Sequence, residues 1–199
     1  MKLIAFEGID ACGKETQAAL LFSWLEDQDK LVYAESFPRY KQPIGQIIRD
    51  WLDGKNDLSD EAIHMLYEAD RQDYMQYVEQ LEMLQVDYMV LDRWVLSNLA
   101  FGYAKGLDVA WLSQLQSKVR KPDITIILDI SPETSVKRRS QGRDRHEQDT
   151  ELLTETRDAY AALAYGLRAN GDEVHFINGE QSPEEIHQQI QEVLKKHFQ

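Results

Sequence analysis

The sequence has a single cysteine, Cys12, in 199 residues, so no disulfide can form within the chain. One thiol is typical of a protein in a reducing compartment, and we expect a cytoplasmic location. No apolar run approaches the ~20 residues that a membrane helix needs. The apolar run Leu3 to Phe6 at the amino end is typical of a strand rather than a signal peptide. We therefore expect no association with a membrane.

Basic residues are scarce: 22 Lys and Arg stand against 35 Asp and Glu, giving a formal net charge of −13. A general nucleic-acid binder needs a basic surface to displace counterions, so nucleic acid is not expected as a partner. The balance favours a small anionic ligand held by a few local cations. With 43% apolar and 29% charged residues, the chain is long enough for one compact domain over residues 1–199.

The five histidines show no metal-ligand spacing, and none is a convincing catalytic base: His64, His146, His175, His187 and His197. Catalysis that depends on a histidine general base is therefore not predicted from the sequence.

A glycine-rich run with a lysine follows the first apolar segment and leads into a helical pattern. Backbone N–H groups of such a loop can surround phosphate oxygens, and the helix N-terminus and the lysine add positive charge. The alternative is an ordinary strand-to-helix turn, but the position between strand and helix favours a phosphate loop. The residues predicted to bind the phosphates of a ligand, which the resemblance described below implies is ATP, are Gly8, Asp10, Ala11, Cys12, Gly13, Lys14, Glu15 and Thr16.

Glu15 stands where Ser or Thr usually follows the lysine and helps to hold Mg²⁺. Either its carboxylate or water alone could fill that place. Asp92, at the end of a predicted strand, could orient metal-bound water. Glu15 and Asp92 are therefore the candidate metal residues, with Mg²⁺ as the cofactor.

Short apolar runs alternate with helical patterns along the whole chain. This alternation predicts an α/β domain with a doubly wound sheet of about five parallel strands flanked by helices. The predicted strands are 2–7, 31–36, 88–91, 124–128 and 174–177. The predicted helices include 15–28, 43–52, 59–84, 107–119, 151–170 and a final helix that ends at residue 198.

Several polar and aromatic residues follow the carboxyl ends of predicted strands, where open parallel sheets bind ligands. Phe37 to Lys41 offers two cations and two aromatic rings after the second strand. Tyr67 and Arg71 share a helix face and could hold a base, or they could be a core tyrosine and a solvated arginine. Arg93 could bind a second phosphate, or it could form a structural salt bridge with Asp92.

A basic cluster in this acidic chain, containing Gly142, predicts a mobile lid over residues 138–150. The alternative is a solvated charged loop, but a phosphate-binding site favours a functional role. Its members are Lys137, Arg138, Arg139, Arg143 and Arg145.

Taken together, these motifs resemble the thymidylate kinase family over essentially the whole chain. The resemblance rests on 6–17, Phe37-Pro38-Arg39, 66–71, Asp92-Arg93-Trp94 to Ser97, Lys121-Pro122-Asp123 and Asp144-Arg145. It implies a P-loop NTPase-type fold with a mobile lid, and phosphorylation of dTMP by ATP with Mg²⁺. It also implies ATP and dTMP as partners and a homodimer.

The resemblance also implies roles for single residues. Lys14 would hold the β and γ phosphates of ATP, and Arg93 would bind the dTMP phosphate. Tyr67 would stack on thymine, and Arg71 would hydrogen-bond its O4. The full set implied to bind dTMP is Asp10 (3′-hydroxyl), Phe37, Arg39 and Tyr40 (phosphate support), Tyr67, Arg71, Arg93, Ser97, Asn98 (base edge), Phe101 and Tyr160 (sugar).

In some family members an arginine in the phosphate loop assists transfer, and in others the lid supplies it. Ala11 and Cys12 bring no arginine to this loop, so the chain resembles the lid-arginine kind. Arg143 and Arg139 are then the candidates, with Lys14 and Arg93, for catalysis.

One departure leaves the acceptor open. Gly102 stands where many members place Gln or Thr near the base, and Asn98 could take over that contact. The alternative is a kinase of another pyrimidine deoxynucleotide, such as one modified at C5. A P-loop nucleotide-binding switch is a third reading, which would lack an acceptor pocket.

Overall fold

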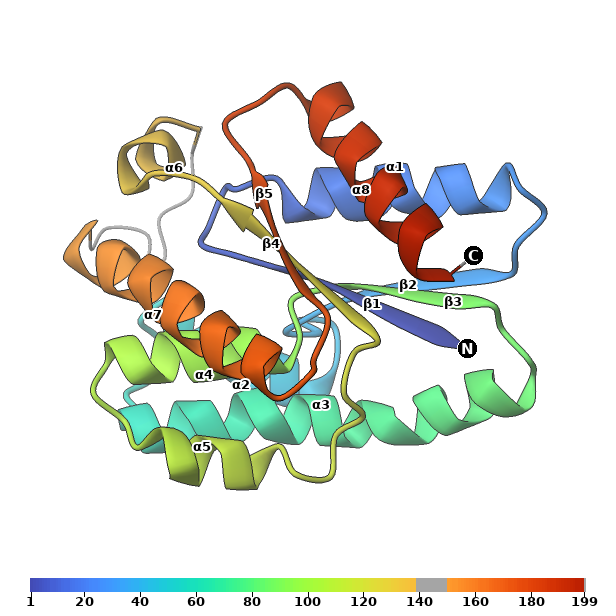
Figure 1. Ribbon diagram of the computed structural model, residues 1–199. Helices are drawn as coiled ribbons and strands as arrows, with labels where there is room; N and C mark the ends of the chain where they lie inside the picture. Colours follow the sequence, from blue (N-terminus) through green and yellow to red (C-terminus); the bar gives the residue numbers. More distant parts are fainter. Residues whose placement is uncertain (139–149, 199) are drawn as a thin grey trace.

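The computed structural model describes residues 1–138 and 150–198, in which strands and helices alternate (Figure 1). The predicted Arg139, Arg143 and Arg145, and almost all of the predicted lid, lie outside the described residues. The strands are β1 (Lys2–Glu7), β2 (Val32–Ser36), β3 (Tyr88–Asp92), β4 (Ile124–Asp129) and β5 (Val174–Asn178). The helices are α1 (Lys14–Glu26), α2 (Pro43–Leu52), α3 (Asp60–Met83), α4 (Val95–Ala104), α5 (Val109–Leu115), α6 (Pro132–Arg138), α7 (Thr150–Ala169) and α8 (Pro183–Phe198).

The strands form one parallel sheet in the order β2-β3-β1-β4-β5, which confirms the doubly wound α/β prediction. Strand β1 is central because its run Leu3 to Phe6 is apolar throughout and fully buried. Its residue Ile4 pairs with Val90 of β3 on one side and with Ile124 of β4 on the other. The loop that follows β1 therefore leaves the sheet at its centre.

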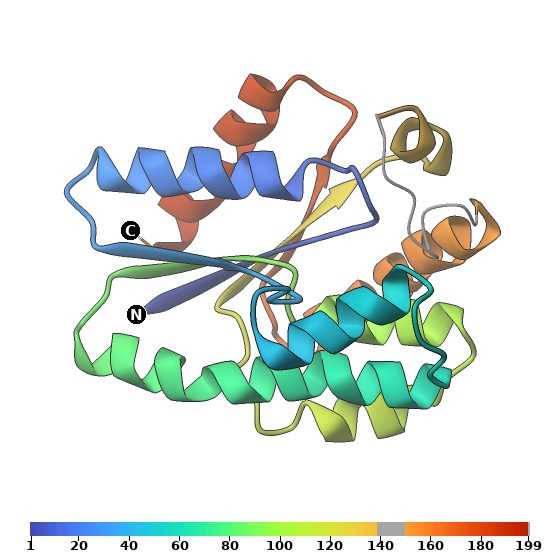
Figure 2. The same cartoon turned by 180° about the vertical axis from the view of Figure 1, so that it is seen from behind.

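Helices cover both faces of the sheet, with α1 and α8 on one side and α3, α4, α5 and α7 on the other (Figures 1 and 2). Successive residues of β1 point to opposite faces, as the period of a strand requires. Leu3 and Ala5 pack in a cluster with Val78 of α3. Ile4 and Phe6 pack in another with Leu21 of α1. Both faces of the central strand are thus sealed by apolar side chains.

Most predicted boundaries differ from the structure by one or two residues, and one helix is clearly shorter. The helix predicted over 107–119 spans only Val109–Leu115. The Asp108 side chain accepts a hydrogen bond from the Ala110 N–H and begins the helix there. The edge strand β2 is also more exposed than an apolar-run prediction implies, since only Val32 of its five residues is buried.

The carboxyl ends of three strands meet at one edge of the sheet. The N–H of Arg93, directly after β3, donates to Phe6 O of β1 at 2.9 Å, and the N–H of Phe37, directly after β2, donates to Asp92 O at 2.9 Å. This edge therefore gathers the phosphate loop, the Phe37 segment and the Asp92-Arg93 pair.

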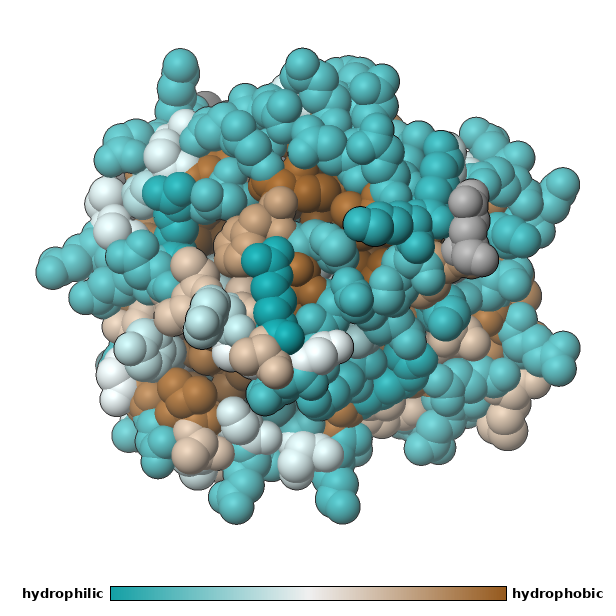
Figure 3. All heavy atoms as spheres, viewed as in Figure 1, coloured by the Kyte–Doolittle hydropathy of each residue, from teal (hydrophilic) through white to brown (hydrophobic). Residues whose placement is uncertain are grey.

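Hydrophilic side chains dominate the face of the molecule seen in Figure 3, and apolar ones gather in small groups. Within residues 1–138 and 150–198, no helix combines the length and apolar character that crossing a membrane would require.

Replacing Ile4 with Ala should lower the free energy of unfolding by about 2–5 kcal/mol, because the fully buried side chain would leave a cavity between two core layers. Urea unfolding followed by tryptophan fluorescence measures this loss. Met83→Ala is the control, since its side chain is 76% exposed and should change stability by less than about 0.5 kcal/mol. Equal losses for the two variants would contradict the assigned core.

Candidate active site

The loop between β1 and α1 is shaped by two glycines. Gly8 has φ 135°, and a Cβ there would lie 2.6 Å from the backbone oxygen of Leu128. Gly13 has φ 102° and forms the N-cap of α1. Both positions require a residue that tolerates positive φ at little cost. The sequence thus folds the loop tightly against the start of the helix.

The Lys14 side chain is buried and curls back along this loop. Its Nζ donates to Ile9 O at 2.9 Å and to Gly8 O at 3.2 Å. The ammonium group therefore lies inside the ring of loop backbone, beside the N-terminus of α1. Cys12 is fully buried, while Glu15 and Thr16 are exposed on the first turn of the helix.

Arg93 is the cation that joins this loop to the sheet edge. Its Nη1 donates to Gly8 O at 3.1 Å and to Ser97 Oγ at 3.2 Å, and its Nη2 forms an ion pair with Asp10. Burial acts to lower the pKa of Arg93, but the neighbouring acidic groups, with Asp10 first among them, together outweigh it, and the pKa lies above the ordinary value. Arg93 also has φ 65°, a strained conformation for a side-chain-bearing residue and one that clusters at functional sites.

A buried carboxylate beneath Arg93 holds the start of α4, and sequence reasoning gave it no role. Glu7 is fully buried; its Oε1 accepts the Trp94 N–H at 2.9 Å, and its Oε2 accepts a short hydrogen bond from Ser97 Oγ and one from Tyr160 OH at 3.3 Å. Ser97 Oγ and Tyr160 OH are 2.8 Å apart. Burial and the Glu7 charge raise the pKa of Tyr160, so the phenol stays protonated. The only signal in the sequence was an acidic residue at the end of an apolar strand.

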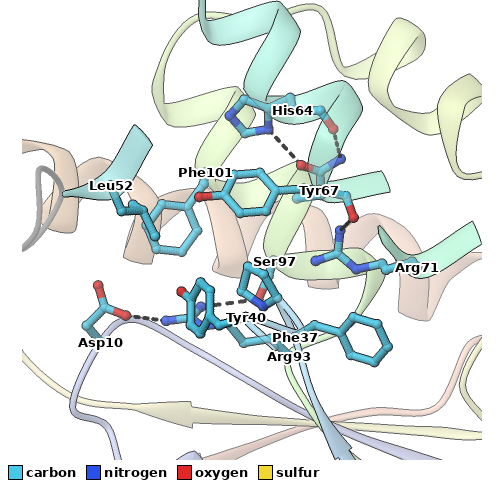
Figure 4. Close-up of a pocket in the computed structure, with 12 residues that line it drawn as sticks. Asp10, Phe37, Tyr40, Leu52, His64, Tyr67, Arg71, Arg93, Ser97 and Phe101 are labelled. Carbon is cyan, nitrogen blue, oxygen red and sulfur yellow. Dashed lines mark hydrogen bonds and ion pairs between the residues drawn. The ribbon is translucent and has the colours of Figure 1, made fainter. Parts of the chain in front are cut away.

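An open cleft lies beside the loop, with about 550 Å³ of empty space that includes open solvent. Figure 4 shows Asp10 and Arg93 at one end and His64 at the other, with Tyr67 and Phe101 between them. The lining residues are Asp10, Phe37, Pro38, Tyr40, Leu52, His64, Tyr67, Arg71, Arg93, Ser97, Asn98 and Phe101. The structure thus brings together nine of the eleven residues predicted to bind dTMP. The other two, Arg39 and Tyr160, are buried and are not among these lining residues.

Tyr67 and Arg71 both line the cleft, in keeping with their shared helix face. Arg71 is not the solvated side chain of the alternative reading, since only 3% of it is exposed. Its Nη1 donates to Tyr67 O at 2.9 Å and lies 3.5 Å from Glu68 Oε2. Within the described part of the chain, its buried Nε has no hydrogen-bond partner. A buried donor without a partner is costly, and a ligand acceptor would satisfy it.

Arg39 is held behind the cleft by two carboxylates. Its Nε donates to Asp70 Oδ1 at 3.0 Å, and its Nη2 donates to Asp73 Oδ2 at 2.7 Å and to Asp70 O at 2.9 Å. Burial acts to lower the pKa of Arg39, but these carboxylates outweigh it and raise it overall. This arrangement fixes the Phe37 to Tyr40 turn, and contact of Arg39 with a phosphate stays a prediction.

Three further residues that line the cleft were not assigned to the site by sequence reasoning: Pro38, Leu52 and His64. His64 lies three residues before Tyr67 on the same helix, which places it on the same face. That spacing was a usable signal. Leu52 ends an apolar helix pattern and looks like any core residue, so its position in the cleft needs the fold.

The candidate metal residues fit Mg²⁺ in part. Among the described residues, Asp92 Oδ1 is buried without a hydrogen-bond partner, at the sheet edge beside the loop. Those residues contain no group of three or more acidic, histidine or cysteine side chains that could hold a metal. Mg²⁺ with a nucleotide needs only one or two carboxylates, because phosphates and waters complete its shell. Asp92 and the exposed Glu15 could supply these carboxylates.

Comparisons with known proteins agree on one family. Residues 6–190 match the family model described as Thymidylate kinase. The chain is 33% identical over 193 residues to a thymidylate kinase of Arabidopsis thaliana, covering 96% of this chain and 70% of the relative. It is 32% identical over 200 residues to a probable thymidylate kinase of Pyrococcus abyssi, covering 96% and 95%.

Among solved structures, thymidylate kinase from Candida albicans has the same fold, with a TM-score of 0.84 at 24% identity. The match covers 98% of this chain and 91% of the other.

The folded protein should lose stability on acidification because of His64. Burial lowers the pKa of His64 from 6.5 to about 4, so between these values the unfolded chain binds more protons than the folded one. The contribution of His64 to the free energy of unfolding is therefore fully present above pH 6.5, and it is lost as the pH falls towards 4. We expect a loss of about 2 kcal/mol from this residue between pH 7.5 and pH 5.

Urea unfolding at several pH values measures this loss, with His64→Asn as the comparison. The titrations of His175 and His187 are common to both proteins, so the difference in pH dependence isolates His64. Identical profiles for the two proteins would show that His64 does not titrate as a buried neutral group.

Proposed function

The chain belongs to the thymidylate kinase family, and we propose that it transfers the γ-phosphoryl group of ATP to dTMP, giving dTDP and ADP. The observation that carries this proposal is the cleft beside the phosphate loop, with Arg93 at its loop end and Tyr67 and Arg71 towards its far end. A phosphate loop alone would suit any nucleotide-binding protein. An acceptor nucleotide requires in addition a cleft, separate from the phosphate loop, with its own cation and aromatic ring.

On the donor side, the loop backbone from Gly8 to Thr16 would surround the phosphates of ATP. Lys14 would leave its contacts with Gly8 O and Ile9 O to bind the β and γ phosphates. Bound Mg²⁺, with Asp92 or Glu15 as its protein carboxylate, would neutralise charge on the transferring group.

On the acceptor side, the dTMP phosphate would meet Arg93, and the base would lie against Tyr67. The unpartnered Nε–H of Arg71 suits the O4 acceptor of thymine. Phe101, whose ring centre lies 5.3 Å from the Arg93 guanidinium, would close the sugar side together with Tyr160. Asp10 would hold Arg93 in place and lie near the 3′-hydroxyl.

Transfer between two bound anions asks mainly for alignment, exclusion of water and neutralisation of charge. The acceptor phosphate is already nucleophilic near neutral pH, so no strong general base is needed. Lys14 and Arg93 would supply two of the cations, and Arg143 and Arg139 of the lid would supply the rest. Arginines of this kind contribute about 10³–10⁵ in rate in well-studied phosphoryl transfers.

The proposal extends to the state of the protein. We expect a homodimer in the cytoplasm, as the family resemblance implies. Gel filtration with light scattering measures the mass in solution, and a monomer mass at working concentration would remove the dimer from the proposal.

A coupled ADP-release assay with a panel of monophosphates tests the function. We expect turnover with dTMP, none with dGMP, and ADP release only when an acceptor is present. The Candida albicans enzyme is described as having broad substrate specificity, so dUMP and 5-substituted pyrimidines belong in the panel. Turnover with a 5-substituted pyrimidine but not with dTMP would favour the alternative acceptor. Acceptor-independent hydrolysis would favour a nucleotide switch.

Replacing Arg93 with Ala should lower kcat/KM for dTMP by about 10³-fold, because the acceptor phosphate would lose its main cation. Steady-state kinetics measures the loss, and circular dichroism shows that the variant is folded. Arg168→Ala is the matched control, since this exposed arginine lies on α7 and donates to Val174 O. Loss of activity in both variants, or in neither, would contradict the role of Arg93.

A further inference from the structure

His64 and Asn98 form a polar pair at the far end of the cleft from Arg93. They come from α3 and α4, they both line the cleft, and 1% and 2% of them are exposed. His64 Nδ1 and Asn98 Oδ1 are 2.7 Å apart, and Asn98 Nδ2 donates to the backbone oxygen of His64 at 3.3 Å (Figure 4). Two contacts therefore join the same two residues.

These contacts fix which way the Asn98 amide points. The His64 backbone oxygen can only accept, so the amide end that faces it must be the NH₂ group. The carbonyl end then faces the imidazole, so Nδ1 must carry the hydrogen that Oδ1 accepts. His64 is thus a neutral imidazole protonated at Nδ1, which agrees with burial lowering its pKa.

The Asn98 amide also lies near the carboxylate of Glu68. Burial raises the pKa of Glu68, while Arg71 and the Asn98 side chain act in the opposite direction, which places the amide near the carboxylate. Among the described residues neither Glu68 oxygen has a full hydrogen bond, so this contact is loose. Since the Nδ1–H of His64 uses one lone pair of Asn98 Oδ1, the second lone pair remains as an acceptor for a ligand.

An acceptor at this position discriminates between pyrimidines. Thymine carries a hydrogen on N3 and a keto oxygen at C4, whereas cytosine carries a lone pair on N3 and an amino group at C4. The N3 lone pair of cytosine would face the Oδ1 lone pair, and its amino group would face the donors of Arg71. We propose that His64 is a positioning residue that locks the Asn98 amide and thereby sets the preference for a diketo pyrimidine over cytosine.

Gly102 supplies the space that this lock needs. A Cβ at residue 102 would lie 3.2 Å from both Nδ1 and Cε1 of His64, and 2.5 Å from Leu112 Cδ1. A larger residue would therefore push the imidazole ring. The position of the His64–Asn98 pair therefore depends on the absence of a side chain at residue 102.

The inference rests on the proposed function for its substrate, and two variants of His64 test it. His64→Leu introduces an apolar side chain of similar size that cannot donate to Oδ1, so only the longer contact, from Asn98 Nδ2 to the backbone oxygen of residue 64, still orients the amide. His64→Asn can donate from an amide nitrogen close to the position of Nδ1. The measurements are kcat/KM and the calorimetric Kd for dTMP and for dCMP.

We expect His64→Leu to lower the dTMP-to-dCMP preference by about tenfold, mainly through KM and Kd, because an amide that has lost the shorter of its two contacts rejects cytosine less strongly. His64→Asn should stay within about threefold of the wild-type preference. The matched control is His187→Leu on α8, which should leave the preference unchanged. A folded His64→Leu variant with the wild-type preference would overturn the inference, as would failure of His64→Asn to restore it.

Two further measurements keep the inference testable if His64→Leu does not fold. Gly102→Ala should lower the preference in the same direction by displacing the ring, and an unchanged preference would count against the lock. Nitrogen-15 NMR of the wild-type protein at pH 7 should show the Nδ1–H tautomer of His64. The Nε2–H tautomer would overturn the inference outright.

The outcome is separable from that of the proposed function. Absence of phosphoryl transfer to dTMP would contradict the proposed function. The ratio of the Kd values for dTMP and dCMP would still test the role of His64. Equal binding of dTMP and dCMP by the wild-type protein would overturn the inference even if transfer occurred.

Discussion

The site depends on holding one guanidinium, that of Arg93, between the phosphate loop and the sheet edge. A buried cation is costly unless charges and hydrogen bonds compensate it. Here the Asp10 carboxylate, the Gly8 carbonyl and the Ser97 hydroxyl supply that compensation. Each of these groups comes from a segment that follows the carboxyl end of a strand, so the fold determines where the cation lies. Glu7, at the end of β1, supports this arrangement, because its carboxylate accepts hydrogen bonds from Ser97 and from the start of α4.

The polar groups at the two ends of the cleft differ in kind. Near the loop, oppositely charged groups compensate one another, and this is the end at which an anion would bind. At the far end, His64 and Asn98 are neutral and are arranged by hydrogen-bond direction rather than by charge. Aromatic and apolar side chains such as Tyr67, Phe101 and Leu52 lie in the same cleft and exclude water. A nucleotide has the same polarity pattern, with charge at the phosphate and directional groups at the base.

Local pattern accounted for much of this arrangement, and its limits are physical. The parallel α/β architecture could be anticipated because short apolar runs alternate with helical patterns, and the phosphate loop because Gly8, Gly13 and a lysine stand between a strand and a helix. The order of the strands was not predicted. Tyr67 and Arg71 could be paired because helix spacing alone puts them together. Glu7 could not be assigned, because its role comes from contacts with residues such as Tyr160 far along the chain. Spacing could place His64 on the helix face of Tyr67, but its contact with Asn98 of another helix needed the fold. The helix predicted over 107–119 began too early because a side-chain cap at Asp108, not apolar periodicity, sets where α5 begins.

The ion pair between Asp10 and Arg93 has a consequence for how the free protein meets anions. Without an acceptor, the guanidinium already carries its own counterion, so the cleft presents little bare positive charge to the solvent. An incoming phosphate must share the guanidinium with this tethered carboxylate, because Asp10 holds Arg93 in place. The tethered counterion therefore weakens the attraction of the free cleft for inorganic anions.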